Sequence, residues 1–324
     1  MRPDARLHLL LLVLVAFLVT GCGDDRSVCL SAPLPAASGT WVSAVLREGG
    51  ETVIHTVDER RIVVPSDPQR IVSTLPGITE AVLMLDGGGR LVGVSPHDDD
   101  VPELAGIERV SVMPIAWEAL QALEPDLLLV DETLVGAEIE RLRQRFPAVL
   151  PLRSRSLADL KTSVELLAQV IGTPRALRKA RRFGARLEKA VGEAVAAPGA
   201  TPMRVLLLAQ PDPVYALGPG SLMDDMLRTC GVVNIACDLG RASGPFASEL
   251  VKTRRPDWIL VTGGRVEDVP IAQWSDVPAV LQGRVLRADS DDLVRAGPRI
   301  PAALERLADV LHGRVSMDTL TEAR

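Results

Sequence analysis

The chain has 324 residues, of which 47% are hydrophobic and 24% charged, and its formal net charge is −6. This length is enough for two ordinary domains, each with its own core. The negative balance excludes nucleic acid as the main partner, because no overall positive field is present to attract phosphates. Aromatic residues make up only 3% of the chain, so aromatic stacking can contribute at few places.

The first 21 residues have the features of a signal peptide. Two arginines precede an unbroken apolar run of eleven residues that ends at Val19. This run is too short to span a bilayer core, for which a helix needs roughly 20 residues. The sequence Thr20-Gly21-Cys22 follows it and resembles the bacterial lipobox, whose cysteine receives a lipid and becomes the mature N-terminus. Cys22 is therefore the predicted lipidation site, and an ordinary signal peptide with a chance cysteine is the alternative.

Composition and pattern divide the rest of the chain into four segments. We expect a flexible tether, with one short ordered piece around residues 41–46, then two α/β lobes with a connecting helix between them. The predicted bounds are 1–21 for the signal peptide, 22–50 for the tether, 51–155 for the N-terminal lobe, 156–200 for the connecting helix and 201–314 for the C-terminal lobe.

The N-terminal lobe begins with alternating residues between Val53 and Val64, which surround a polar middle and predict a β-hairpin. Prolines at 65 and 68 end it. Downstream we expect a strand at 70–73, a helix at 78–85 that stops at a run of glycines, and a strand at 91–94.

An internal repeat is the most informative feature of the sequence. Glu118 precedes Pro125-Asp126 by seven residues, and Glu249 precedes Pro256-Asp257 by the same interval. In both copies a helical stretch leads to the Pro-Asp turn and then to an apolar run that suits a parallel strand covered on both faces. A further strand begins near Arg204, and a helix begins near Ser221. The repeat predicts two similar α/β lobes.

The segment from Leu157 to Val195 has helical periodicity, and Gly172 and Pro174 would bend or restart the helix. A long helix between two α/β lobes makes a fairly rigid hinge. Its many basic residues are expected to form a solvated face, and binding to anionic lipid is the alternative. They are Arg175, Arg178, Lys179, Arg181, Arg182 and Arg186.

Three cysteines remain if Cys22 is lipidated, an odd number for an oxidising compartment. Cys230 and Cys237 are close enough in sequence to pair, which would leave Cys29 free in the tether. The sequence has no CxxC or Cys/His spacing typical of zinc sites.

Several motifs in order resemble the periplasmic binding proteins for cobalamin, haem and iron-siderophores. They are Arg70–Ser73, Thr79-Glu80, Arg90–Val94, the two Glu-(x)6-Pro-Asp units and Arg295–Arg299, and the likeness covers about residues 52–312. The second lobe looks closest to the cobalamin-binding member. The resemblance implies two Rossmann-like lobes with parallel sheets, joined by one long helix, with the ligand in the cleft between them. It also implies a monomer that serves an ABC permease dimer, at the periplasmic face or the cell surface, held by its N-terminal lipid.

The resemblance assigns permease docking to Glu118 and Glu249. A pair of equivalent carboxylates on two similar lobes suits a partner with approximate twofold symmetry. Pairing of these carboxylates with arginines would orient the encounter and accelerate it. The alternative is that both glutamates are present because helix N-termini favour acidic residues.

Ligand contacts are expected in loops after strands, where open α/β sheets bind ligands. His97 would ligate a haem or corrin metal, or be a plain surface residue. Tyr215, Asp291 and Arg295 match contacts of the cobalamin binder, although the last two could instead form an intramolecular ion pair. Fewer aromatic residues are present than in that binder. The predicted ligand-binding set is Pro76, His97, Met113, Asp131, Tyr215, Phe246, Asp291 and Arg295.

The expected function is therefore capture of a metal-chelate nutrient and its delivery to a permease. The ligands are ranked as cobalamin or another corrinoid first, haem second and a ferric siderophore third. A sensor or accessory lipoprotein of the same fold is the runner-up. We expect no enzyme, because GxSxG, Walker, GxGxxG and HExxH motifs are missing from the sequence. No cofactor is implied, and the scattered histidines do not favour a binder of free metal ions.

Overall fold

The computed structural model describes residues 41–99, 101–195, 202–288 and 291–315. The predicted signal peptide, Cys22, Cys29 and the tether up to residue 40 lie outside these ranges. Within the ranges, no helix has both the length and the apolar composition that crossing a bilayer requires.

A small antiparallel sheet begins the described chain. Its strands are β1 (Val42–Glu48), β2 (Glu51–Thr56) and β3 (Arg61–Pro65), in the order β1-β2-β3. Gly49 and Gly50 have φ of 59° and 88°, values that a two-residue hairpin turn requires and that glycine adopts without strain. The predicted hairpin at 53–64 is confirmed, and β1 shows that the last part of the predicted tether is a strand.

The N-terminal lobe contains a five-stranded parallel sheet in the order β6-β5-β4-β7-β8. The strands are β4 (Ile71–Ser73), β5 (Leu91–Val94), β6 (Glu108–Arg109), β7 (Leu127–Asp131) and β8 (Val149–Leu152). The helices are α3 (Pro76–Met84), α4 (Trp117–Ala122), α5 (Glu132–Val135) and α6 (Ile139–Arg143), with 3₁₀ turns at Gly88–Arg90, Pro102–Leu104 and Gly136–Glu138.

The C-terminal lobe contains a six-stranded sheet with the main order β12-β10-β9-β13-β14, and β11 pairs with β9. The strands are β9 (Arg204–Gln210), β10 (Tyr215–Leu217), β11 (Val233–Asn234), β12 (Ser243–Pro245), β13 (Trp258–Val261) and β14 (Val285–Arg287). The helices are α9 (Leu222–Thr229), α10 (Ser248–Arg254), α11 (Pro278–Leu281), α12 (Asp291–Val294) and α13 (Ile300–Leu311), with a 3₁₀ turn at Val266–Asp268.

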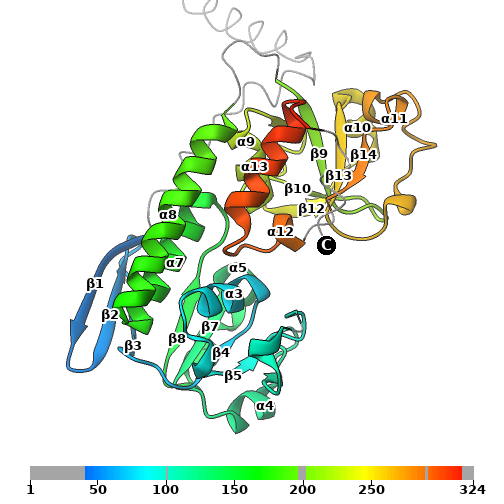
Figure 1. Cartoon of the computed structure of the whole chain (residues 1–324). Helices are drawn as coiled ribbons and strands as arrows, with labels where there is room; N and C mark the ends of the chain where they lie inside the picture. Colours follow the sequence, from blue (N-terminus) through cyan, green and yellow to red (C-terminus); the bar gives the residue numbers. More distant parts are fainter. Residues whose placement is uncertain (1–40, 100, 196–201, 289–290, 316–324) are drawn as a thin grey trace, which may run out of the picture.

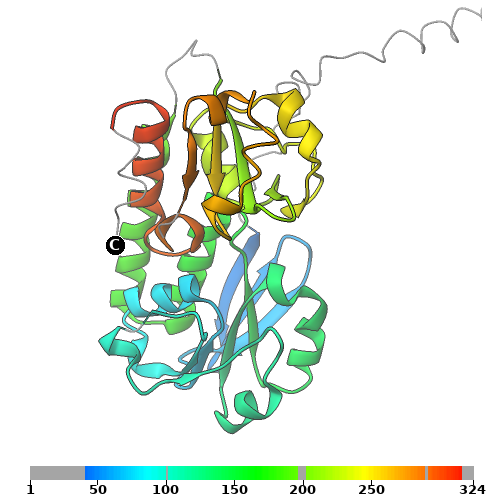
Figure 2. The same cartoon turned by 90° about the vertical axis from the view of Figure 1, so that its right-hand side faces the viewer.

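The second sheet is mixed, which differs in detail from the parallel sheet that the sequence predicted. Its strands β9, β11, β13 and β14 are parallel, but β10 runs antiparallel to β9, and β12 runs antiparallel to β10. The short hairpin between β9 and β10 allows this, because antiparallel neighbours need no crossover helix. The two-lobed α/β architecture itself is confirmed (Figures 1 and 2).

The Pro-Asp repeat has the same structural role in both lobes. Asp126 precedes β7, and its carboxylate accepts the backbone N–H groups of Gln69 at 2.7 Å and Arg70 at 3.0 Å. Asp257 precedes β13 and accepts the backbone N–H of Arg204 at 2.9 Å. Each aspartate therefore joins the start of one parallel strand to the start of its neighbour, which fixes where the two strands begin.

The connecting segment folds as two helices, α7 (Leu157–Ile171) and α8 (Pro174–Ala194). Gly172 has φ of 79°, and the Thr173 hydroxyl accepts the N–H of Ala176 at 3.0 Å, so one helix ends and the next begins within two residues. The Lys161 ammonium lies 2.7 Å from the Glu188 carboxylate, which shows that the helices pack antiparallel. The restart that the sequence allowed is therefore present, and a single apolar core extends from both helices into both lobes.

The Cys230–Cys237 disulfide that the sequence left open is not formed. Cys230 is a free thiol and is buried, and this burial raises its pKa to about 12. Cys237 is disulfide-bonded, so its partner is a different cysteine. Cys230 is the C-cap residue of α9, and its side chain is buried in the core that contains residues of α9 and α13. Closeness to Cys237 in the sequence gave no information about where the Cys230 side chain points.

Candidate functional site

A cavity of about 440 Å³ lies between the two lobes. Its walls include segments that follow the carboxyl ends of the parallel strands β4, β7, β8 and β13, where open α/β sheets place their ligands. Segments next to the antiparallel strands β10 and β12 and the segment between α12 and α13 complete the walls. The N-terminal lobe contributes Leu75, Pro76, Gly77, Ile78, Asp131, Thr133, Ser154 and Arg155. The C-terminal lobe contributes Leu217, Gly220, Ser221, Leu222, Met223, Ala242, Ser243, Thr262, Leu293, Val294, Arg295 and Ala296.

Asp131 is the buried carboxylate of this cavity, with a residue exposure of 4%. It is the last residue of β7, and its carboxylate accepts the Ser154 hydroxyl at 2.5 Å and the backbone N–H of Thr133 at 2.8 Å. These two bonds hold the carboxylate in place while Thr133 and Ser154 also line the wall. Asp131 therefore fixes the polar side of the cavity in the N-terminal lobe.

Two helices direct their first turns at the cavity. Residues 75–78, at the start of α3, and residues 221–223, at the start of α9, belong to the lining. In α9 the Ser221 hydroxyl accepts the N–H of Asp224 at 3.3 Å, whereas α3 has no side-chain cap. The positive ends of the helix dipoles therefore face the cavity and favour electron-rich groups of a ligand.

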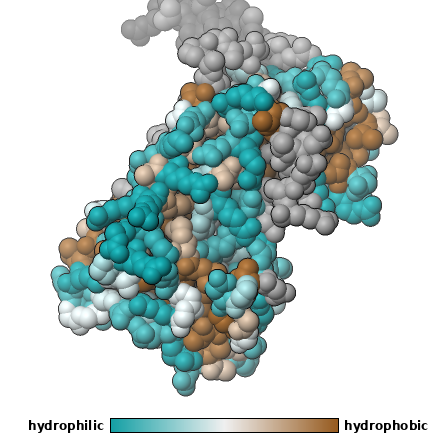
Figure 3. All heavy atoms as spheres, in the orientation of Figure 1, coloured by the Kyte–Doolittle hydropathy of each residue, from teal (hydrophilic) through white to brown (hydrophobic). Residues whose placement is uncertain are grey.

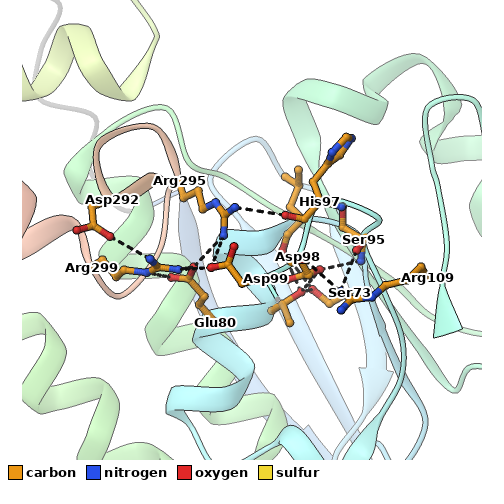
Figure 4. Close-up of polar contacts among 12 residues, drawn as sticks. Ser73, Glu80, Ser95, His97, Asp98, Asp99, Arg109, Asp292, Arg295 and Arg299 are labelled. Atoms are coloured by element: carbon orange, nitrogen blue, oxygen red, sulfur yellow. Dashed lines mark hydrogen bonds and ion pairs between the residues drawn. The ribbon is translucent and has the colours of Figure 1, made fainter. Parts of the chain in front are cut away.

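A cross-lobe ionic cluster lies beside the C-terminal wall (Figure 4). Arg295 and Arg299 lie on either side of the turn between α12 and α13, and both approach Asp99 of the N-terminal lobe, at 2.8 Å and 2.9 Å. Arg299 also pairs with Glu80 of α3, and with Asp292 at 3.0 Å. Hydrogen bonds to these carboxylates raise the pKa of Arg299. We call Glu80, Asp99, Asp292, Arg295 and Arg299 the interlobe cluster.

The loop that carries Asp99 is itself held in place by Asp98. The Asp98 carboxylate accepts the backbone N–H of Ser95 at 2.8 Å and lies 3.1 Å from the Thr79 hydroxyl (Figure 4). Burial raises the pKa of Asp98, since removal from water disfavours its charged form. The neighbouring aspartates thus have different roles: Asp98 secures its own lobe, and Asp99 reaches the other lobe.

The lobes also meet through backbone contact next to the cluster. A side chain at Gly77 would overlap the carbonyl oxygen of Ala296, and one at Gly297 would lie 3.0 Å from the Gly77 Cα. Glycine at both positions therefore permits the first turn of α3 to approach the segment before α13. This contact closes one side of the cavity.

The structure brings three of the eight predicted ligand residues to the cavity lining, namely Pro76, Asp131 and Arg295. His97 is exposed beside the wall, where its backbone carbonyl accepts Arg295 at 3.4 Å. Met113 is 63% exposed in a different loop and lines no part of the cavity. Asp291 begins α12, but its side chain lies outside the described part of the structure, so the alternative of an Asp291–Arg295 pair stays open.

Tyr215 and Phe246 do not line the cavity either. Tyr215 begins β10, two residues before the lining residue Leu217, so both side chains face the same side of the strand. Tyr215 lies at the opposite end of β10 from Leu217 and is not part of the lining. Phe246 follows Ser243 by three residues and therefore faces the opposite side, where it is buried in the second core of the C-terminal lobe. The Arg254 guanidinium lies 5.8 Å from its ring centroid. Ligand contact by Phe246 therefore stays a prediction that its place in this core does not support.

Most of the polar lining residues were not among the predicted ligand contacts. Thr133, Ser154 and Thr262 each follow the end of a buried parallel strand, and Ser221 is a helix N-cap. The sequence repeat predicted the strands that end before Thr133 and Thr262. Because ligands bind beyond the carboxyl ends of such strands, these two residues could have been predicted as lining residues. No group of three or more His, Cys, Asp and Glu suited to a metal ion occurs in the described ranges.

The two repeat glutamates occupy matching places on the lobes. Glu118 is the second residue of α4, and Glu249 is the second residue of α10, and both are exposed. The two helices lie at outer parts of opposite lobes (Figure 1). Beside Glu118, the guanidinium groups of Arg141 and Arg145 lie over the Trp117 ring, 5.2 Å and 4.4 Å from its centroid.

The sequence matches the periplasmic binding protein family over residues 71–291. An uncharacterized ABC transporter substrate-binding lipoprotein of Bacillus subtilis is 25% identical over 312 residues, which cover 93% of this chain and 95% of that protein. A vitamin B12-binding protein of Salmonella typhimurium is 32% identical over 254 residues, covering 75% of this chain and 90% of the relative.

The solved structures of binding proteins share the fold. The periplasmic vitamin B12-binding protein of Vibrio cholerae has a TM-score of 0.68 at 23% identity and covers 79% of this chain and 98% of its own. The periplasmic haem-binding protein of Vibrio cholerae has a TM-score of 0.64 at 22% identity, with 75% and 99% covered. The chain therefore belongs to the periplasmic binding protein family, as an ABC-transporter substrate-binding protein.

Proposed function

We propose that this protein is a lipoprotein that captures a metal chelate in the interlobe cavity and delivers it to an ABC permease dimer. The lipid on Cys22 would hold it at the periplasmic side of the membrane or at the cell surface. The observation that carries this proposal is a cavity between two lobes, each of which presents an exposed glutamate at the same place in its helix-turn-strand repeat.

The cavity lining supports a ligand with both apolar surface and many polar groups. Leucine, valine and methionine side chains alternate with hydroxyl groups, Asp131, Arg155 and Arg295. Among the described lining residues none is aromatic, so a planar ring system would rest on aliphatic side chains. A corrinoid, with amide groups around its ring, fits this mixture and ranks first; haem ranks second, and a ferric siderophore third. The vitamin B12-binding relatives support a corrinoid as the first choice.

The two glutamates support delivery rather than capture alone. Neither lines the cavity, and both are exposed at the second residue of a short helix. Exposed carboxylates there can pair with arginines of a two-subunit permease without disturbing the ligand. The proposed docking glutamates lie outside the cavity lining, so docking and ligand binding can be changed separately.

Uptake of labelled corrinoid by cells that carry the permease tests delivery. The double variant Glu118→Gln, Glu249→Gln should lose most uptake, whereas purified protein should bind ligand with unchanged affinity. The control Glu51→Gln, Glu267→Gln removes one exposed glutamate from each lobe at places outside the repeat. Unchanged uptake in the first variant would reject docking by these residues and favour a sensor or accessory role.

A further inference from the structure

The outer face of α8 carries a dense basic stripe. Arg178, Arg182 and Arg186 recur at four-residue intervals, which places them on one side of the helix, and Arg181 lies next to them. All four are exposed. We call these four residues the α8 basic face. Hydrophilic residues cover this part of the molecule in Figure 3.

The α8 basic face is not neutralised within the described structure. Asp86 pairs with Arg175 and Lys179, and Lys189 pairs with Glu193, but the four residues of the face form no ion pair among the described residues. The helix sequence contains seven basic and two acidic residues, although the whole chain has a net charge of −6. Helix α8 is therefore strongly positive, although the chain as a whole is negatively charged.

The rest of α8 is committed to the protein core. Its other side buries Ala176, Ala180, Phe183, Leu187 and Ala190, so no apolar face remains to insert into lipid tails. A contact with a membrane would be electrostatic and would stay at the level of the headgroups. Such contacts depend on anionic lipid and weaken with salt.

The first described strand lies beside helices α7 and α8. β1 begins at Val42, and the side chain of Arg47 near its other end donates a hydrogen bond to the backbone carbonyl of Gln169 in α7. A hollow between β1 and the helices is lined by Val45 and Arg47 on one side and by Leu177 and Arg181 on the other. β1, the first described strand, therefore lies on the side of the molecule that carries the α8 basic face.

We propose that the α8 basic face lies on anionic phospholipid headgroups of the membrane that holds the lipoprotein. This inference rests on the proposed function only for the lipid anchor at Cys22. The lipid would supply the anchor, and a basic patch would add electrostatic attraction that sets which face of the protein meets the headgroups. Each cationic side chain near an anionic surface strengthens binding about fivefold.

This contact would define a resting orientation. α8 contributes no residue to the cavity lining, and Glu118 and Glu249 lie on α4 and α10. In Figure 1, α8 lies on the left side of the molecule next to the β1–β3 sheet, whereas α4 lies at the bottom and α10 at the upper right. A membrane against α8 therefore leaves the cavity and both glutamates uncovered, and the protein turns away from the lipid when it docks.

Vesicle co-sedimentation tests the proposal. The protein is prepared as residues 22–324 with Cys22→Ser, which removes the apolar leader and the lipid and leaves electrostatic binding. The test variant is Arg178→Gln, Arg182→Gln, Arg186→Gln, since glutamine keeps helix propensity. The control Arg241→Gln, Arg265→Gln, Arg287→Gln removes the same charge from the C-terminal lobe. Vesicles contain phosphatidylcholine with or without phosphatidylglycerol, in about 0.1 M salt, where the Debye length is about 10 Å.

We expect binding to the phosphatidylglycerol vesicles only, a loss of at least about tenfold in the test variant, and little change in the control. Binding should also disappear near 1 M salt. The proposal would be overturned if the test and control variants bound the phosphatidylglycerol vesicles equally well. It would also be overturned if the parent protein bound the neutral vesicles as strongly as the anionic ones, or bound neither. Corrinoid titration of the same samples reports on the proposed function separately, because α8 is remote from the cavity lining.

Discussion

The carboxylate of Asp99 in the N-terminal lobe lies 2.8 Å from the guanidinium of Arg295 in the C-terminal lobe. The same carboxylate lies 2.9 Å from Arg299, which also pairs with Glu80. Because Arg295 lines the cavity, the relative position of the lobes and the shape of the C-terminal wall depend on the same ion pairs. The interlobe cluster therefore links ligand binding to the arrangement of the lobes.

Acid should weaken this link. Burial alone would raise the pKa of Asp99, but hydrogen bonds from Arg299 and Arg295 outweigh it and hold the pKa below its ordinary value of 3.8. A carboxylate with a lowered folded-state pKa stabilises the fold at higher pH and loses that contribution as pH falls through the folded value. Thermal unfolding from pH 6 to pH 3 should therefore show a shallower acid decline in Asp99→Asn than in the parent. At neutral pH we expect this partly exposed pair to contribute about 1 kcal/mol. Parallel pH curves for both proteins would contradict the role of Asp99.

The close backbone approach at Gly77 predicts a second effect. Gly77→Ala places a methyl group against the Ala296 carbonyl, which is backbone and cannot rotate away. We expect a loss of about 1–3 kcal/mol in the free energy of unfolding, or a displaced lobe visible as an increased radius of gyration. Gly89→Ala is the control, because nothing lies within 4 Å of its added carbon. A stable Gly77→Ala protein with an unchanged radius would show that the contact does not constrain the lobes.

The cysteines predict a defined chemical pattern. Burial raises the pKa of Cys230 to about 12, so its thiol should resist alkylation in the native protein and react only after denaturation. Cys237 should not react without a reductant, because it is disulfide-bonded. Lipidation would occupy the Cys22 sulfur, so we predict Cys29 as the partner of Cys237. Mass spectrometry of non-reduced peptides measures the pairing, and a Cys230–Cys237 peptide would refute it.

Local patterns made much of the fold predictable. Alternating apolar residues gave the hairpin that became β2 and β3, and the apolar runs after Pro-Asp gave β7 and β13. The recurrence of Asp126 and Asp257 has a local physical cause, since each accepts backbone N–H groups at the start of the adjacent strand. Such features depend on residues that are close together in the sequence, so they can be predicted without a structure.

Features that depend on distant packing were not predictable in the same way. The antiparallel directions of β10 and β12 depend on how these strands pair with their neighbours. The burial of the Phe246 and Cys230 side chains depends on the elements that pack against them. The interlobe cluster joins residues about 200 positions apart, and only the relative position of the lobes brings them together. For the same reason the sequence identified Arg295 as a site residue but gave no indication of its partner Asp99.

Calorimetric titration of the purified protein with cobinamide, cyanocobalamin, haemin and ferric chelates tests the central claim most directly. We predict one-to-one binding of at least one of these ligands, weakened at least about tenfold by Ser243→Trp, which fills the cavity. Ser43→Trp, at an exposed serine of β1 outside the cavity, should bind as the parent does. Failure of every chelate to bind, or equal binding by both tryptophan variants, would contradict capture of a metal chelate between the lobes.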